Sequence, residues 1–185
     1  MLVLKRMAHI IIVAHLDSQH SRQLAHRIRE GVESTGNLCT IVDVDKMNYD
    51  ILLGSNAIIF GCPTIMGSAS AAFKAFMEDT YDKFNEQVFK NKFAAGFTYG
   101  AAVSGDKFHT LQELCNFASQ HSMHWISQGN IRENEAVNAN VPINSLNSYL
   151  GNMSQYINGI YGQEFMETAY YFGRRVGATV YRVAL

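Results

Sequence analysis

A turn of small and hydroxyl-bearing residues carries the clearest chemical signal in the sequence. Residues 60–68 read Phe-Gly-Cys-Pro-Thr-Ile-Met-Gly-Ser, with an apolar run at 57–60 before them and a helical pattern at 69–84 after them. The apolar run predicts a buried strand, and the spacing of Phe73 and Phe76 predicts one helical stripe. Such a turn places backbone N–H groups at the carboxyl edge of a parallel sheet, where open α/β folds bind their ligands.

The first loop along the chain, residues 14–21, joins a predicted strand at 8–13 to a helix that begins near Ser21, and the turn at residues 60–68 is the second loop. Ser18 and Ser21 supply hydroxyls there, and the free N–H groups and positive dipole of a helix N-terminus suit a phosphate group. Serines that only cap the helix are an equally good interpretation. The chain has no Gly-x-Gly-x-x-Gly and no Walker A motif, so neither a dinucleotide fold nor a nucleotide hydrolase is indicated.

A third loop, residues 98–106, follows a predicted strand at 92–98 and is again small, hydroxyl-bearing and aromatic. Its backbone can approach a flat ring closely while Tyr99 offers a stacking face. An ordinary strand-to-helix loop is the alternative. The three loops meet in one crevice if the strands take the order 2-1-3-4-5, which has its topological switch between the first and third strands.

Strands and helices alternate along nearly the whole chain, which favours a parallel sheet covered by helices on both faces. The predicted strands are residues 8–13, 38–42, 57–60, 92–98 and 124–127. The apolar faces of the first and last predicted helices are formed by Leu24, Ala25, Ile28, Val32, Phe165, Ala169, Phe172, Val176 and Val180.

The segment 128–162 departs from this alternation because it is polar and rich in asparagine. A connection of this length is unusual inside a compact domain. One interpretation is a surface excursion with a helical turn around residues 146–156. Another is a rim over the ligand site or a contact between subunits. The two are compatible, and both stay open.

Composition narrows the class of protein. With 185 residues, 48% of them hydrophobic and two prolines, the chain is predicted to form a single domain over residues 1–185. A formal net charge of −1 gives no basic field for nucleic acid, and no apolar run approaches the ~20 residues of a membrane span. Cys39, Cys62 and Cys115 form no Cys-x-x-Cys pair, which indicates free thiols in a reducing, cytoplasmic compartment. The seven histidines lack metal-ligand spacing, so no metal site is predicted.

Several of these motifs resemble known ones. Residues 18–25, Ser-Gln-His-Ser-Arg-Gln-Leu-Ala, resemble the phosphate loop of flavodoxins. Residues 61–68 and the helix after them, residues 71–76, resemble the Pro-Thr-x-x-Gly loop of the tryptophan-repressor-binding-protein-like (WrbA-like) NAD(P)H:quinone oxidoreductases and NADPH-dependent FMN reductases. His-Ser-Met at 121–123 resembles the His-Gly-Met before their fifth strand. The resemblance follows the strand order over nearly the whole chain.

This resemblance implies an α/β flavodoxin-like three-layer sandwich that binds FMN, with a five-stranded parallel sheet of order 2-1-3-4-5. The FMN phosphate would be held by His15, Ser18, Gln19, His20 and Ser21. The isoalloxazine ring would be lined on one side by Pro63, Thr64, Ile65, Met66 and Gly67, and on the other by Thr98, Tyr99, Gly100, Ser104, Gly105 and Asp106. His121 would lie near the exposed face of the ring, as the candidate catalytic residue.

The implied function is that of an oxidoreductase in which NAD(P)H reduces bound FMN and a quinone or similar small acceptor is then reduced. A homo-oligomer, a dimer or a tetramer, is also expected, and the surplus tyrosines Tyr170, Tyr171 and Tyr181 are candidates for its interface. An electron carrier of the same fold is one alternative, although carriers are usually strongly acidic. A flavin-poor binding or regulatory module is another, because Gln19 stands where the phosphate loop usually has glycine.

Overall fold

The computed structural model describes residues 7–103, 105–129 and 141–183. Ser104, which was predicted to line the ring, and the 130–140 part of the asparagine-rich segment lie outside the described residues.

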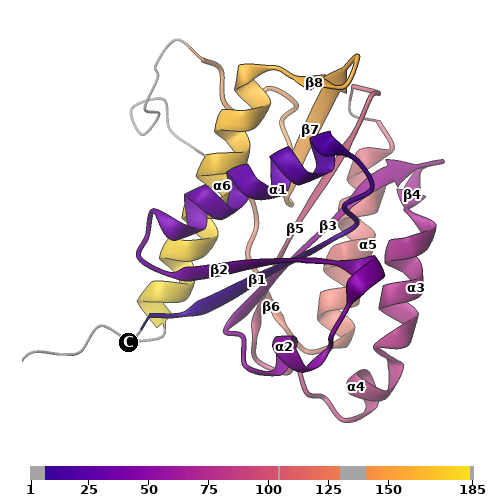
Figure 1. The fold of residues 1–185 in the computed structure, drawn as a ribbon, viewed down its shortest axis with the longest axis vertical. Helices are drawn as coiled ribbons and strands as arrows, with labels where there is room; N and C mark the ends of the chain where they lie inside the picture. The colour runs from indigo at the N-terminus through magenta and orange to yellow at the C-terminus, as the bar shows by residue number, and fades with distance from the viewer. Residues whose placement is uncertain (1–6, 104, 130–140, 184–185) are drawn as a thin grey trace, which may run out of the picture.

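A twisted sheet runs through the molecule, and its strands follow the predicted order (Figure 1). The parallel strands are β1 (His9–Ala14), β2 (Leu38–Asp43), β3 (Ala57–Ile65), β5 (Phe93–Gly100), β6 (His124–Trp125) and β7 (Asn152–Ile157). Their order is β2-β1-β3-β5-β7-β8, with β6 beside the start of β5. Two short antiparallel strands, β4 (Ser68–Ala69) and β8 (Ile160–Tyr161), turn back from β3 and β7. The flavodoxin-like α/β fold is therefore confirmed.

The fifth position of the sheet is occupied by two separate strands. β6 pairs with Phe93 and Ala94, and β7 pairs with the carboxyl half of β5, where Asn152 lies opposite Phe97. The prediction of a helical turn around residues 146–156 is wrong, because residues 152–157 complete the sheet. Polar side chains hid this strand: Asn152 and Ser154 are fully buried and bond to each other, with Ser154 Oγ 3.1 Å from Asn152 Oδ1.

Helices cover both faces of the sheet. α1 (Gln19–Glu33) and α6 (Gln163–Val183) pack on one face, while α3 (Ala71–Asp79) and α5 (Lys107–Gln120) pack on the other (Figure 1). Side chains alternate along β1, so that Ile10 and Ile12 join the first core and Ile11 and Val13 the second. The single helix predicted at 69–84 is instead two, because Thr80 separates α3 from α4 (Tyr81–Asn85). A 3-10 turn (Val44–Lys46) and α2 (Asp50–Leu53) connect β2 to β3.

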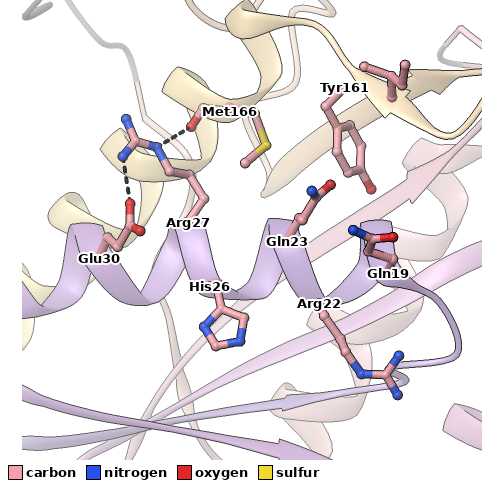
Figure 2. Close-up of a pocket in the computed structure, with 9 residues that line it drawn as sticks. Gln19, Arg22, Gln23, His26, Arg27, Glu30, Tyr161 and Met166 are labelled. Atoms are coloured by element: carbon pink, nitrogen blue, oxygen red, sulfur yellow. Dashed lines mark hydrogen bonds and ion pairs between the residues drawn. The ribbon is translucent and has the colours of Figure 1, made fainter.

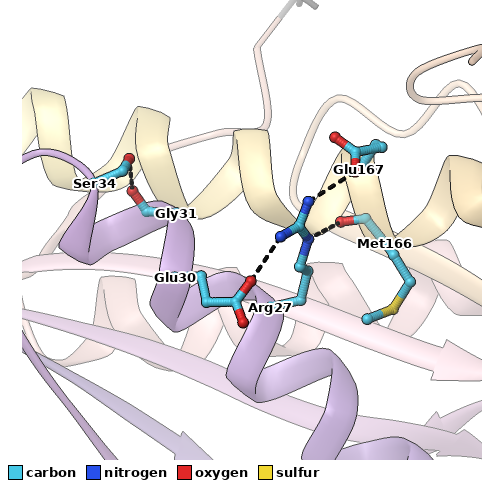
Figure 3. A network of polar contacts seen from close by, with 6 residues as sticks. All are labelled: Arg27, Glu30, Gly31, Ser34, Met166 and Glu167. Carbon is cyan, nitrogen blue, oxygen red and sulfur yellow. Dashed lines mark hydrogen bonds and ion pairs between the residues drawn. The ribbon is translucent and has the colours of Figure 1, made fainter. Parts of the chain in front are cut away.

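α1 and α6 are in close contact. A Cβ added to Gly31 or to Gly173 would overlap the backbone of the other helix, so both positions require glycine. Figure 3 shows how Arg27 joins the two helices: its guanidinium lies 2.6 Å from Glu30 and 2.7 Å from Glu167, and also bonds the carbonyl of Met166.

Two of the tyrosines expected at a subunit interface have roles inside the chain. The ring of Tyr170 lies under the guanidinium of Arg27, at 4.6 Å, and Tyr171 is buried. Neither ring is therefore surplus, and the argument for an oligomer from these residues is weakened.

Candidate functional site

The loop between β1 and α1 ends in a capping box. Ser21 N donates to Ser18 Oγ at 3.2 Å, and Ser18 N donates to Ser21 Oγ at 3.0 Å. Both hydroxyls therefore cap the helix, as one interpretation of the sequence held. The amides of Gln19 and His20 have no hydrogen-bond partner among the described residues, so the N-terminus of α1 still offers N–H groups to an anion.

Tyr99 forms a hydrogen bond that holds this first loop in place. Its side chain is buried, and its hydroxyl donates to the carbonyl of His15 at 2.8 Å and lies 3.5 Å from Asp17. Burial and the charge of Asp17 raise the pKa of Tyr99. The prediction that Tyr99 offers a stacking face is wrong, because β5 continues to Gly100 and turns this side chain toward the α1 face of the sheet.

The second loop is a short β-hairpin that projects from the carboxyl edge. β3 extends through Pro63 and Thr64 to Ile65, and Met66 and Gly67 form a turn with φ values of 50° and 80° before β4. Two positive φ angles are typical of a type I′ hairpin turn. Ile65 is half exposed and Met66 is 98% exposed, so the tip presents apolar side chains to a ligand or to solvent.

α5 holds this hairpin in place. The carboxylate of Glu113 accepts hydrogen bonds from Ser68 Oγ and Ala69 N, both at 2.7 Å. His109 Nδ1 lies 2.7 Å from the carbonyl oxygen of Gly67. At the base of α3, Ser70 Oγ lies 2.9 Å from His15 Nδ1, which joins the first and second loops.

Hydroxyls connect the second loop to the third. Thr64 Oγ1 lies 2.8 Å from both Thr98 Oγ1 and Thr110 Oγ1, and Thr98 Oγ1 donates to the carbonyl of Cys62 at 2.8 Å. The thiol of Cys62 itself is buried, and burial raises its pKa to about 12, so it is an inert packing group.

The third loop lies against the hairpin. Gly100 is buried at the end of β5, while Gly105 and Asp106 are exposed before α5, and a Cβ added to Gly67 would lie 3.7 Å from Asp106 Cβ. Lys107, which sequence reasoning missed, is buried beneath this loop and donates from Nζ to the carbonyls of Ala102 and Val103.

His121 lies at the other end of the sheet from the three loops, beside the amino-terminal ends of the strands. It follows the last residue of α5, where it is buried against three aromatic rings, Phe84, Phe89 and Phe117. Its Nε2 lies 3.0 Å from Thr80 Oγ1, and burial lowers its pKa to about 4. α5 begins beside the three loops and spans about 20 Å. The prediction that His121 borders the ring is therefore wrong.

A second hairpin, which the sequence reasoning also missed, stands on the other side of the first loop. β7 and β8 are joined by Asn158 and Gly159, with φ values of 51° and 76°. The ring of Tyr156 in β7 lies 4.4 Å from the ring of His20. Part of the asparagine-rich segment thus lies beside the first loop, and its role as a rim over a ligand stays a prediction.

A pocket of about 550 Å³ lies beside the first loop, between α1, β8 and α6 (Figure 2). Its lining residues are Gln19, Arg22, Gln23, His26, Arg27, Glu30, Ile160, Tyr161 and Met166. Arg27 is committed to its ion pairs with Glu30 and Glu167, which argues against an anion site there. The side chain of Gln19 lines this pocket, beside the first loop.

The three loops fit FMN in two respects. The unpaired amides at the start of α1 suit its phosphate, and Gly67 and Gly105, both at positive φ, place backbone without side chains in the second and third loops, where a flat ring could approach closely. Tyr161 adds a third feature: its hydroxyl is buried without a hydrogen-bond partner among the described residues, and burial, Tyr156 and Asp17 raise its pKa. Throughout the described ranges, no cluster of His, Cys, Asp and Glu is arranged to hold a metal ion.

Comparison with known proteins agrees with this geometry. Residues 45–136, which contain the second and third loops, match the family described as NADPH-dependent FMN reductase. Over these residues the chain is similar to that family, and its fold is flavodoxin-like.

The relatives of this chain carry different names. The chain is 29% identical over 155 residues to Flavodoxin FldP of Pseudomonas aeruginosa, covering 80% of this chain and 82% of that one. It is 26% identical over 141 residues to Quinone-oxidoreductase QR2 of Triphysaria versicolor, covering 65% and 69%. The crystal structure of a flavodoxin, WrbA-like protein from Agrobacterium tumefaciens superposes with a TM-score of 0.77 at 28% identity, covering 95% and 98%. Among the described helices, none is long and apolar enough to cross a bilayer.

Proposed function

We propose that this protein is an FMN-dependent oxidoreductase that passes electrons from NAD(P)H, through FMN bound at the three loops, to a quinone or a similar small acceptor. The observation that carries the proposal is the meeting of three loops at the carboxyl edge, where the free amides at the start of α1 lie in a loop that His15 joins to the second loop, and Thr64 joins the second loop to β5. The family match and the quinone oxidoreductase relative support the reaction class. FMN would supply the hydride and electron chemistry when bound.

The chain's own residues would bind and orient. The amides of Gln19 and His20, with the dipole of α1, would hold the phosphate, and Tyr99 would fix the loop that carries them. The hydroxyl chain through Thr64 and Thr98 would keep the second and third loops at a constant separation. No side chain is required as a nucleophile.

Exposed apolar side chains at the second and third loops favour a small, uncharged acceptor. Ile65 and Met66 project from the hairpin, and Val103 and Phe108 are exposed beside the third loop. These side chains offer apolar contact to a flat molecule above the ring. The donor and the acceptor would then occupy the same space in turn.

An electron carrier is a second candidate, because one relative is named a flavodoxin and another a flavodoxin, WrbA-like protein. The net charge of −1 speaks against it, since docking to a redox partner usually depends on a strong charge field. A homo-oligomer and a cytoplasmic location remain part of the proposal; buried free thiols such as Cys39 and Cys62 are compatible with a reducing compartment.

The two candidates differ in their response to NAD(P)H. The FMN-loaded protein is mixed without oxygen with NADPH or NADH, and loss of the flavin absorbance is followed before and after a benzoquinone is added. A reductase loses its absorbance at a rate that rises with the nucleotide concentration, and the quinone restores it. A carrier is reduced by neither nucleotide, and that result would contradict the proposal.

Steady-state kinetics then test the shared pocket. With several fixed concentrations of each substrate, parallel double-reciprocal lines are expected, because one substrate must leave before the other enters. Intersecting lines would mean that both substrates bind together, and the single-pocket account would be wrong.

A further inference from the structure

Lys107 is an ammonium group buried without a carboxylate partner. Its side chain is 1% exposed, and Nζ donates to the carbonyls of Ala102 and Val103. It forms no ion pair with any residue that the structure describes. Burial lowers its pKa, and the nearby charge of Asp106 opposes that shift only in part. Burying an ammonium in this way is unfavourable unless its charge is balanced, so the group is suited to a negative charge that arrives with a ligand.

The ammonium group of Lys107 lies next to the proposed flavin site. A Cβ added to Gly100 would lie 3.3 Å from Lys107 Cε and 3.6 Å from Nζ, and 3.7 Å from the carbonyl oxygen of Thr64. The ammonium therefore lies inside the wall where the second and third loops meet. These are the loops that would line the isoalloxazine ring.

Reduction of a flavin creates a charge of the required sign. A hydride from the nicotinamide brings two electrons and one proton to the ring and leaves oxidised nicotinamide behind. If N1 of the ring takes up no second proton, a negative charge remains on the ring. A cation close to that part of the ring stabilises the reduced form and so tunes the flavin's redox behaviour.

We propose that the ammonium of Lys107 stabilises reduced FMN more than oxidised FMN and so raises the reduction potential of the bound flavin. This inference rests on the proposed function, because it requires FMN at the three loops. Lys107 would act on the ring electrostatically, without contacting it, from its buried position between the second and third loops.

The test compares the dissociation constants of oxidised FMN and of dithionite-reduced FMN, measured without oxygen. Lys107→Gln keeps an N–H donor for the two carbonyls but removes the charge, and Lys107→Arg keeps the charge. We expect Lys107→Gln to weaken binding of reduced FMN at least tenfold more than binding of oxidised FMN. A tenfold difference equals a fall of about 30 mV in the two-electron potential. Lys107→Arg should keep the ratio within threefold of the unaltered chain.

Lys92 provides a matched control at the opposite edge of the sheet. Its Nζ also donates to two carbonyls, those of Leu53 and Ser55, and burial also lowers its pKa. Lys92→Gln should leave the ratio of the two dissociation constants unchanged.

The outcomes separate the two claims. Equal weakening of both FMN forms by Lys107→Gln, no weakening, or loss of all FMN binding with the fold intact would overturn the inference, because Lys107 would then only support the loop. If the unaltered chain binds neither form of FMN, the proposed function itself fails, and the inference falls with it.

Discussion

Two β-hairpins stand at the carboxyl edge of the same sheet, and they are built alike but held differently. The β3–β4 hairpin turns at Gly67 and the β7–β8 hairpin at Gly159, with φ values of 80° and 76°, and both tips expose apolar residues. Glu113 and His109 fix the first hairpin to α5. Beyond strand pairing, described residues 157–160 of the second make no side-chain hydrogen bond.

This difference assigns the hairpins different roles in the proposed site. The first is a fixed wall, whose position is set by charged and hydroxyl partners on neighbouring elements. The second is held at its base by Gln155, which donates to the carbonyl of Ala101, and by the ring contact between Tyr156 and His20. It can therefore adjust more readily over the first loop when a ligand binds.

The largest effect is expected from His121, at the other end of the sheet. Because this residue lies far from both hairpins, its replacement also serves as a control for them. The pKa of His121 falls from 6.5 to about 4 on folding, so the unfolded chain binds more protons between these values. The free energy of unfolding should therefore decrease as the pH falls from 6.5 to 4, by up to about 3 kcal/mol. His121→Phe should flatten that dependence in chemical denaturation and leave the FMN dissociation constant unchanged. A tenfold loss of FMN affinity in this variant would contradict the prediction, because His121 would then contribute to FMN binding.

The next largest effect is expected from replacing Glu113, which holds the β3–β4 hairpin against α5. Glu113→Ala leaves Ser68 Oγ and Ala69 N without their acceptor, which should lower the free energy of unfolding by about 2 kcal/mol and weaken FMN binding. Glu78→Ala is the control, because its ion pair with Lys74 is exposed and should contribute less than about 0.5 kcal/mol. Equal losses in the two variants would show that Glu113 does not anchor the hairpin.

Alanine at the two turn glycines tests whether the hairpins differ in rigidity. A Cβ at either position has space, but positive φ angles strain any residue other than glycine by about 1–2 kcal/mol. We expect Gly67→Ala to cost that amount because its hairpin cannot relax, and Gly159→Ala to cost less. Thermal unfolding of both variants measures the difference, and equal costs would contradict it.

The smallest effect is expected at the second hairpin's ring contact. Tyr156→Leu keeps an apolar side chain but removes the ring against His20, so FMN binding should weaken two- to threefold, about 0.5 kcal/mol. Tyr149→Leu, at an exposed position, should change nothing. If the two variants bind FMN equally, the second hairpin has no part in the flavin site.

The sequence was sufficient to predict the sheet order and the three loops, because buried apolar runs end in turn residues at fixed points. It could not show that Tyr99 is buried, since that depends on β5 continuing two residues past Thr98. Proximity along the chain also could not show that α5 carries His121 to the far edge.

The β7–β8 hairpin could be predicted in part from the sequence. Residues 156–161 read Tyr-Ile-Asn-Gly-Ile-Tyr, and Asn-Gly between strand-forming residues is a strong signal for a two-residue turn. The strand before it was not readable, because Asn152 and Ser154 are polar and yet fully buried. Their mutual hydrogen bond, from Ser154 Oγ to Asn152 Oδ1, exists only in the folded chain.

Flavin titration tests the central claim most directly. The unaltered protein is titrated with riboflavin, FMN and FAD while quenching of flavin fluorescence is recorded. If the free amides at the start of α1 hold the phosphate, FMN should bind at least a hundredfold more tightly than riboflavin, and more tightly than FAD. Equal binding of riboflavin and FMN, or no binding of any flavin, would contradict the account of the site.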